Sequence, residues 1–341
     1  MAGWVAGVTA DGVVPAEAVP AAPGPVKRWV LGARPRTFPA AIVPVLVGTA
    51  AAHPLSSRVW DSVAPLVRAP APRINPWWCA LGALVVALSI QIGTNYANDY
   101  SDGIRGTDDA RVGPVRLVAS GLASPSAVKR AAFVAFGVAG AAGVALAWAT
   151  SWWILLVGAA CLLAGWFYTG GPRPYGYAGL GELFVFVFFG LVATVGTYYV
   201  QTVRIDEAVV WFAAVVVGLL STGLLLANNL RDIGTDSVSG KRTLAVRVGR
   251  RIAGWCYVAC VGLPFVGVLV WALVSVSAPV EVNHPIAAFV PLLALPLTLP
   301  LIKTVTSGTE GRALLPLLAG TGRLQLVFGF LVAVSVWSWI P

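Results

Sequence analysis

The sequence predicts an all-α polytopic membrane protein, on three observations. First, 58% of its 341 residues are hydrophobic and only 11% are charged, whereas about 25% of the residues in a soluble globular domain are charged. Second, the apolar residues gather in nine windows, most of them long enough to cross a hydrocarbon core of about 30 Å. Third, basic residues concentrate in alternate loops between these windows. A soluble protein of this size is excluded.

The nine windows predict nine transmembrane helices. They are residues 37–52, 77–97, 127–148, 152–169, 180–200, 209–229, 252–274, 285–302 and 322–340. Prolines interrupt the first and the eighth window, which membrane helices tolerate because neighbouring groups satisfy the freed carbonyls. Residues 1–26 lack the basic region of a signal peptide and are expected to form a disordered leader. Residues 27–341 are expected to form one transmembrane domain, with an irregular Pro-rich loop at 53–76.

The net charge of +9 indicates the orientation of the chain in the membrane. If the N-terminus is cytoplasmic, 19 of the 23 Lys and Arg residues face the cytoplasm, and only Arg58, Arg68, Arg73 and Arg204 face outside. This excess predicts a cell-membrane protein whose N-terminus is cytoplasmic and whose C-terminus lies outside. The sequence contains no nucleic-acid motif, and its four Cys and two His residues show no metal-ligand spacing.

Six of the 14 acidic residues lie in two short stretches, 95–109 and 228–236. Each stretch begins where an apolar window ends, and the alternation of loops places both on the cytoplasmic face. Asn98 and Asp102 are four residues apart, as are Asn228, Asp232 and Asp236, so each set shares one helical face. The Asn-x-x-x-Asp unit recurs four windows later, which predicts two parallel four-helix repeats with a ninth helix appended.

These carboxylates predict a magnesium site. Acidic groups at a helix C-terminus beside a bilayer are unfavourable unless a cation compensates them. Hard oxygen ligands without His or Cys suit Mg²⁺, which usually joins one or two carboxylates to substrate phosphates. Arg116 follows the first cluster, and Lys241 and Arg242 follow the second, so a pyrophosphate is the expected ligand. The alternative is a solvated loop face on which the aspartates pair with Arg105, Arg231 and Lys241, which leaves the repetition unexplained.

Four stretches of the chain resemble the UbiA-type intramembrane prenyltransferases. They are Ala33–Pro39, Asn98–Arg116, Tyr168–Glu182 and Asn228–Gly249, and the resemblance extends from about residue 27 to the end. Within this family the chain is most similar to the branch that acts on 1,4-dihydroxy-2-naphthoate. It departs from the general pattern Asn-x3-Asp-x3-Asp, because position 106 is Gly and the next acid is Asp108.

The resemblance implies a fold and a reaction. The fold would be a nine-helix bundle around a central cavity that opens to the cytoplasm and sideways into lipid. The reaction would be the Mg²⁺-dependent transfer of a polyprenyl group from an allylic polyprenyl pyrophosphate to 1,4-dihydroxy-2-naphthoate. Loss of CO₂ and pyrophosphate gives demethylmenaquinone, in menaquinone biosynthesis. The expected partners are these two substrates and the lipid bilayer.

The expected site residues fall into four groups. The catalytic residues are Asp102, Asp232, Asp236 and Lys241, and the metal ligands are Asp99, Asp102, Asp108, Asp232 and Asp236. The substrate-binding residues are Arg36, Asn98, Arg116, Tyr168, Tyr175, Asn228 and Arg242. The allylic cation needs a dry pocket, which Trp166, Phe184, Phe186 and Phe188 could line. The alternative for each of them is a lipid-facing position or packing inside the bundle, which is favoured for any single one.

Two alternative functions stay open at this point. One is prenyl transfer to another aromatic acceptor, such as 4-hydroxybenzoate or homogentisate. The other is ion-coupled secondary transport, which would place ionisable residues near the bilayer midplane rather than at the window ends.

Overall fold

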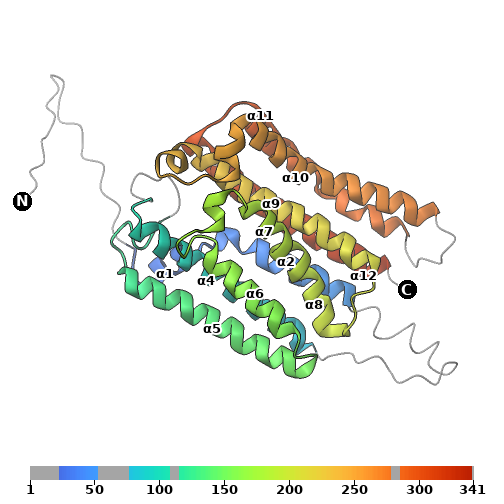
Figure 1. Ribbon diagram of the computed structural model, residues 1–341. Helices are drawn as coiled ribbons and strands as arrows, with labels where there is room; N and C mark the ends of the chain where they lie inside the picture. The colour runs from blue at the N-terminus through green and yellow to red at the C-terminus, as the bar shows by residue number, and fades with distance from the viewer. Residues whose placement is uncertain (1–22, 53–76, 108–114, 278–284, 340–341) are drawn as a thin grey trace, which may run out of the picture.

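The computed structural model describes residues 23–52, 77–107, 115–277 and 285–339, and within these ranges all regular structure is helical (Figure 1). The elements are α1 Pro25–Ala33, η1 Pro35–Thr37, α2 Pro39–Ala52, α4 Trp78–Ile104, α5 Pro125–Ala149, α6 Ile154–Phe167, η3 Tyr175–Ala178, α7 Gly181–Val185, η4 Phe186–Val192, α8 Ala193–Thr202, α9 Ala208–Val238, α10 Leu244–Ser277, η5 Pro285–Leu297, α11 Thr298–Thr306, η6 Gly311–Leu314 and α12 Leu315–Trp339.

The membrane spans agree with the predicted windows. Seven helical segments of the described residues are long and apolar enough to cross a membrane, and an eighth arises if α1–η1 and α2, bent by 57°, count as one span. The shorter apolar helix α6 lies at the position of the remaining window. The prediction of an all-α multi-pass membrane protein is therefore confirmed.

Three segments differ from the prediction in helix type or in length. The eighth window begins as the 3₁₀ helix η5, which contains Pro291 and Pro296, because proline lacks the N–H that a continuous α-helix needs. Helices α4 and α9 continue past the predicted ends at 97 and 229 to Ile104 and Val238. Both Asn-x-x-x-Asp units are therefore part of regular helices rather than of loops.

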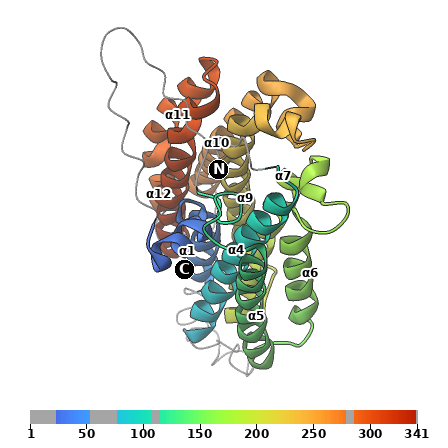
Figure 2. The ribbon, with the colours of Figure 1, turned by 90° about the vertical axis from the view of Figure 1, so that its left-hand side faces the viewer.

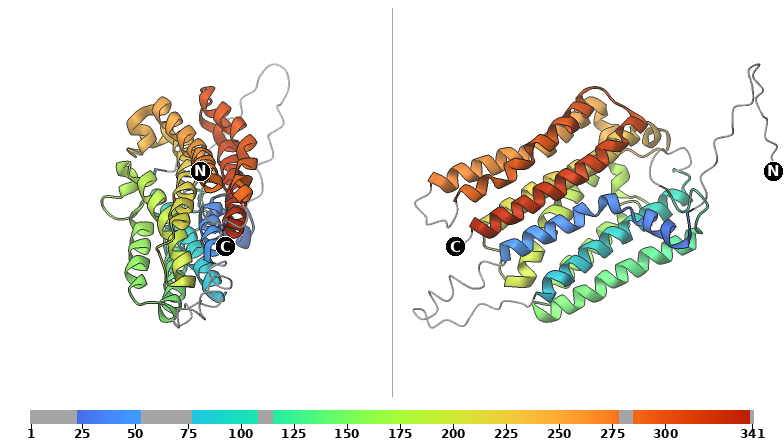
Figure 3. Two further views of the ribbon diagram at one scale, coloured as in Figure 1. Left: turned by 90° about the vertical axis from the view of Figure 1, so that its right-hand side faces the viewer. Right: turned by 180° about the vertical axis from the view of Figure 1, so that it is seen from behind.

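The helices lie side by side, so that the C-terminal ends of α4 and α9 and the segment 168–180 gather at one end of the bundle (Figure 1, and Figure 2 from that end). Helices α10, α11 and α12 form one side and α4, α5 and α6 the other, with α2 and α9 between them (Figure 3). Helix α4 packs along α5, α9 along α10, and α12 along α2. This arrangement brings the two acidic motifs to the same end.

Close backbone contacts hold the centre of the bundle together. The π-helical segment η4 packs against α9, where a Cβ added to Gly190 would lie 2.4 Å from the Cα of Gly218. Helix α2 approaches α8 just as closely, because a Cβ added to Gly48 of α2 would lie 2.4 Å from the carbonyl oxygen of Thr194 in α8. Small residues allow such approaches, on which helix association in a membrane depends.

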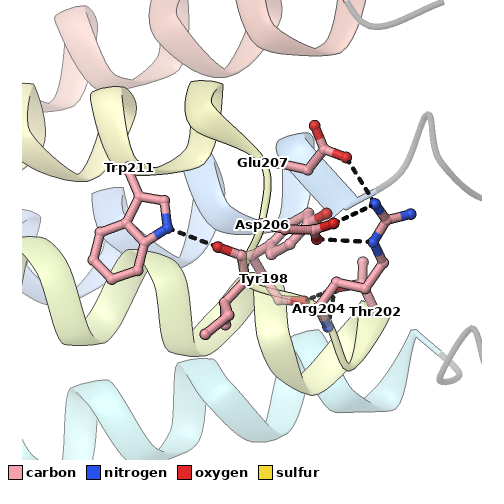
Figure 4. A network of polar contacts seen from close by, with 7 residues as sticks. Tyr198, Thr202, Arg204, Asp206, Glu207 and Trp211 are labelled. Atoms are coloured by element: carbon pink, nitrogen blue, oxygen red, sulfur yellow. Dashed lines mark hydrogen bonds and ion pairs between the residues drawn. The ribbon is translucent and has the colours of Figure 1, made fainter.

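A polar turn joins α8 to α9 at the opposite end of the bundle (Figure 4). The Arg204 guanidinium donates hydrogen bonds to both carboxylate oxygens of Asp206, at 2.9 and 2.7 Å, and lowers the pKa of Asp206 below its usual value. The Trp211 indole donates to the carbonyl oxygen of Ile205 at 2.7 Å. The ion pair is largely exposed and contributes little to stability, whereas the indole contact fixes where α9 begins.

Candidate active site

The first acidic motif contacts the basic residue Lys241, which follows the second motif. The ammonium group of Lys241 lies 2.7 Å from Oδ2 of Asp102, and both side chains are buried. The Tyr177 hydroxyl donates to Oδ1 of Asp102 at 2.5 Å. With its amide oriented to satisfy both neighbours, Asn98 donates to Oδ2 of Asp102 at 2.8 Å and accepts from Nη1 of Arg34 at 3.3 Å. Asp102 is thus joined to residues from three other parts of the chain.

A left-handed turn returns Lys241 to the site. Helix α9 ends at Val238, and Gly240 has φ +76°, a backbone conformation that glycine adopts without a Cβ clash. The Lys241 amide donates to the carbonyl oxygen of Asp236 at 2.9 Å, and the Arg242 amide donates to that of Tyr177 at 3.1 Å. Lys241 is therefore turned inward, while the side chain of Arg242 is exposed.

Asp232 forms a two-point ion pair with its neighbour. Nε and Nη2 of Arg231 donate to the two carboxylate oxygens of Asp232 at 2.7 and 2.8 Å, and both side chains are 2% exposed. Asp236, one turn further along α9, is also buried. The alternative of a solvated loop face is wrong for these residues: Arg231 and Lys241 do pair with the aspartates, but inside the protein.

Asp99 holds the segment that carries Arg116. Its two carboxylate oxygens accept hydrogen bonds from the backbone amides of Leu117 and Val118 at 2.8 and 3.1 Å. Arg116 is mostly buried and lines the central cavity. Because both carboxylate oxygens of Asp99 accept hydrogen bonds from main-chain amides, Asp99 positions the Arg116 segment rather than facing a metal ion. Asp108, the other acid expected to bind metal beside Asp102, lies outside the described residues.

The turn between α1 and α2 presents Arg34 to the cavity. Arg34 has φ +55°, a strained conformation for a residue with a side chain. The amide of Asn95 on α4 holds this turn by donating to the carbonyl oxygen of Ala33 at 2.8 Å and to the Thr37 hydroxyl at 3.1 Å. Nε and Nη2 of Arg34 are buried without a hydrogen-bond partner among the described residues. These two N–H groups are available to an anionic ligand.

The segment between α6 and α7 contributes three tyrosines. The Tyr175 hydroxyl donates to the carbonyl oxygen of Ala164 at 2.8 Å, and its ring stacks on Phe184 with the ring centres 3.9 Å apart. Arg105, just after α4, donates to the carbonyl oxygens of Thr169 and Gly171, both at 2.5 Å. Burial and the charge of Asp102 raise the pKa of Tyr177 above its usual value, so that its hydroxyl stays protonated.

A cavity of about 900 Å³ runs through the bundle. The expected catalytic residues Asp102, Asp232, Asp236 and Lys241 do not themselves line it. At the site end it is lined by Arg34, Arg36, Asn98, Arg116, Tyr168, Tyr175, Asn228 and Arg231. Further in, its wall is mainly apolar, and it reaches Trp153, Ile205 and Trp211 near the opposite end. Phe184 and Phe188 line it as expected, whereas Phe186 packs against Gly218 and Trp166 against Phe133. The prediction that all four aromatic residues line the pocket is wrong for these two.

The residues at the site fit Mg²⁺ by their chemistry. Asp102, Asp232 and Asp236 supply carboxylate oxygens, and neither acidic motif contains His or Cys. Among the described residues, no group of three or more acidic, His or Cys side chains lies close enough together to hold a metal ion without further ligands. Magnesium does not need such a group, because it usually takes one or two carboxylates and completes its shell with phosphates and water.

Comparison with known proteins identifies the family. The model of the UbiA prenyltransferase family matches residues 63–318. The chain belongs to the UbiA prenyltransferase family. It is 47% identical over 309 residues to the 1,4-dihydroxy-2-naphthoate octaprenyltransferase of Mycobacterium tuberculosis, covering 90% of this chain and 95% of that protein. It is 33% identical over 317 residues to the Escherichia coli protein of the same name, covering 90% and 94%.

Solved structures of UbiA homologues share the fold. A UbiA homologue from Archaeoglobus fulgidus bound to DMAPP and Mg²⁺ aligns with a TM-score of 0.56 at 15% identity, over 90% of this chain and 99% of that one. A UbiA homologue from Aeropyrum pernix aligns with a TM-score of 0.56 at 13% identity, over 88% and 95%. At this level of identity the likeness supports the UbiA fold of the chain.

Sequence reasoning missed three members of the site. Tyr177 lies between the expected Tyr175 and the acidic Glu182, but no spacing rule connects it to Asp102. Arg34 is one of two arginines in the Ala33–Pro39 stretch, and only its φ angle and buried N–H groups distinguish it from Arg36. Glu182 is buried and accepts a hydrogen bond from the Asn229 amide at 2.8 Å.

Proposed function

We propose that this UbiA family member transfers a polyprenyl group from an allylic polyprenyl pyrophosphate to 1,4-dihydroxy-2-naphthoate. The carboxyl group of the acceptor leaves as CO₂ and pyrophosphate is released, which gives the reduced form of demethylmenaquinone. The naphthoate octaprenyltransferases at 47% and 33% identity support the choice of acceptor. The contact between Lys241 and Asp102 carries the proposal, because it brings the basic residues and carboxylates of both motifs into one site.

The basic residues of the site stabilise the leaving pyrophosphate. When bound, Mg²⁺ supplies positive charge to the pyrophosphate oxygens as the allylic carbon–oxygen bond breaks. A bound ion would take one or two of the carboxylates of Asp102, Asp232 and Asp236, and Arg116 and Lys241 would add their charges. Both cations are buried, so that their interaction with developing negative charge is stronger than it would be in water.

Arg34 is the best-placed residue for the acceptor carboxylate. Its guanidinium lines the cavity, and its Nε and Nη2 form the planar fork that matches a carboxylate. Asn98 connects Arg34 to Asp102, which would keep an acid bound at Arg34 close to the breaking bond. The strained backbone at Arg34 supports this role, because such strain is concentrated at functional sites.

The apolar part of the cavity suits the isoprenoid chain and excludes water. Tyr175 and Phe184 form a stacked aromatic wall next to the polar end. An allylic cation needs such a wall, because water would capture it before the naphthoate ring does. The rest of the cavity extends towards Trp153 and Trp211, along the direction in which a chain attached to the pyrophosphate would lie.

We also infer that the site end faces the cytoplasm. The elements at this end include the residues around Arg34, Arg105, Lys241 and Arg247, which belong to the 19 basic residues on the predicted inner side. Both substrates would then reach the site from the cytoplasm or from the inner leaflet.

A product analysis tests the function. Purified protein is incubated with Mg²⁺, a polyprenyl pyrophosphate and, separately, 1,4-dihydroxy-2-naphthoate, 4-hydroxybenzoate and homogentisate, and the products are identified by mass. We expect a decarboxylated prenyl product from the naphthoate alone. Prenylation of 4-hydroxybenzoate without reaction of the naphthoate would disprove the acceptor and keep the reaction class.

A further inference from the structure

Tyr177 connects all three segments that build the site. Its hydroxyl bonds to Asp102 in the first motif, and its carbonyl oxygen accepts the amide of Arg242 after the second motif. Two cations lie over its ring: the guanidinium carbon of Arg105 is 5.3 Å from the ring centre and the ammonium of Lys241 is 5.2 Å from it. No other tyrosine of the described residues combines these contacts.

The two oxygens of Asp102 have different partners. Tyr177 bonds to Oδ1, whereas Lys241 and Asn98 approach Oδ2. A donor on one oxygen fixes the rotation of a carboxylate, and it therefore decides which lone pairs are directed to a ligand. With Tyr177 on Oδ1, Oδ2 is the oxygen that would bind a cation, and Lys241 lies 2.7 Å from it.

We propose that Tyr177 is a positioning residue of the metal site: its hydroxyl aims Asp102 at the cation, and its ring keeps Lys241 beside the site when the cation takes the place of Lys241. The proposal rests on the proposed function only for the role of the metal in turnover. The hydroxyl and the ring of Tyr177 have different roles, and Tyr177→Phe removes the first whereas Tyr177→Leu removes both.

The first test measures metal binding without substrates. Purified wild type and Tyr177→Phe are titrated with Mn²⁺, and free Mn²⁺ is followed by electron paramagnetic resonance. Loss of a partner that orients a metal ligand typically weakens binding about 10- to 100-fold, and we expect the Tyr177→Phe dissociation constant to rise at least to the lower end of that range. The Mg²⁺ concentration for half-maximal turnover rises in parallel, whereas kcat at saturating Mg²⁺ stays within about threefold.

The second test removes the ring as well. Tyr177→Leu loses the surface on which Lys241 and Arg105 lie, so we expect kcat at saturating Mg²⁺ to fall about tenfold below that of Tyr177→Phe, the effect of about 1.4 kcal/mol at the barrier. Equal kcat values for the two variants would disprove the role of the ring.

Tyr257→Phe is the matched control. The Tyr257 hydroxyl pairs with the Thr321 hydroxyl at 2.7 Å inside the bundle, and neither residue belongs to the two motifs. If Tyr177 served stability alone, both Phe variants would lower the unfolding temperature and neither would change Mn²⁺ binding. Mn²⁺ affinity of Tyr177→Phe within twofold of that of Tyr257→Phe would overturn the proposal. If 1,4-dihydroxy-2-naphthoate were the wrong acceptor, the Mn²⁺ titrations would be unchanged. Failure of the proposed function is therefore distinguishable from failure of the role assigned to Tyr177.

Discussion

The Lys241 ammonium group lies 2.7 Å from Asp102 Oδ2, where the sequence predicts that a divalent cation binds. A cation bound there would compete with Lys241 for this oxygen, and Lys241 would then pair with the pyrophosphate. The turn at Gly240 holds the backbone of Lys241 through the hydrogen bond of its amide to the carbonyl oxygen of Asp236.

We expect Lys241→Ala to lower kcat by a factor on the order of 10²–10³, with a smaller change in KM, because charge on the pyrophosphate grows as its bond breaks. Steady-state kinetics measure kcat and KM separately. Lys241→Arg keeps the positive charge but changes the shape of the cationic group, so its kcat should lie between those of wild type and Lys241→Ala. The assigned role would be wrong if Lys241→Ala raised KM alone.

We expect Asp102→Asn, Asp232→Asn and Asp236→Asn each to remove nearly all turnover while membrane insertion is retained. Rates within about threefold of wild type for two of the three, less than about 0.7 kcal/mol at the barrier, would contradict a metal site.

Asp232→Asn also carries a stability effect. It leaves the Arg231 guanidinium, which is 2% exposed, without its two-point partner, and breaking a buried ion pair from one side costs about 3–5 kcal/mol. The double variant Arg231→Gln/Asp232→Asn should recover the thermal unfolding temperature but not the activity. Recovery of activity would show that Asp232 serves only to neutralise Arg231.

Arg34→Gly should separate backbone strain from ligand binding. Glycine accepts the φ of +55° at this position, so the unfolding temperature should not fall. Loss of the guanidinium should raise KM for the aromatic acid about tenfold or more, because hydrogen bonds to charged groups contribute about 1.5–3 kcal/mol. If KM for the polyprenyl pyrophosphate rises instead, Arg34 binds the other substrate.

Gly190→Ala should destabilise the bundle by about 1–3 kcal/mol, the usual cost of adding a group to a filled contact. The new Cβ would meet the backbone of Gly218 at 2.4 Å, and neither backbone can move without separating η4 from α9. Gly137→Ala is the control, because nothing lies within 4 Å of its Cβ position. Thermal unfolding in detergent measures both, and equal unfolding temperatures would contradict the tight contact.

Thiol labelling tests the orientation. In a background without the four native cysteines, Ala119→Cys and Ser237→Cys lie on exposed positions at the site end, and Ser277→Cys lies at the opposite end. A membrane-impermeant reagent should label the first two only from the cytoplasmic face and the third only from outside. Labelling of positions 119 and 237 from opposite faces would contradict a shared site.

The sequence predicted the features that follow from regular spacing. Four-residue intervals placed Asn98 and Asp102 on one helical face, and the alternation of loops placed Asp102 and Lys241 at one end of the bundle. The same interval distinguishes Phe184 and Phe188, which line the cavity, from Phe186, which points to Gly218 on the other side. Applied to the aromatic residues, helical period would have separated Phe186 from Phe184 and Phe188.

The missed residues depend on contacts that no spacing encodes. The position of Tyr177 relative to Asp102 is set by a 3₁₀ turn and by Arg105, which bonds to the carbonyl oxygens of the same segment. Arg34 is distinguished by a backbone angle, and the two oxygens of Asp99 by main-chain amides. Composition gives none of these geometries, because each arises when segments far apart in the chain pack together.

Each buried aspartate whose ion pair is described here, Asp102 and Asp232, already has a basic side chain on it. The charges of these two carboxylates are therefore compensated within the protein, so folding of the bundle would not require magnesium for that purpose. Magnesium bound at Asp102 would compete with the ammonium group of Lys241 for the same carboxylate oxygen.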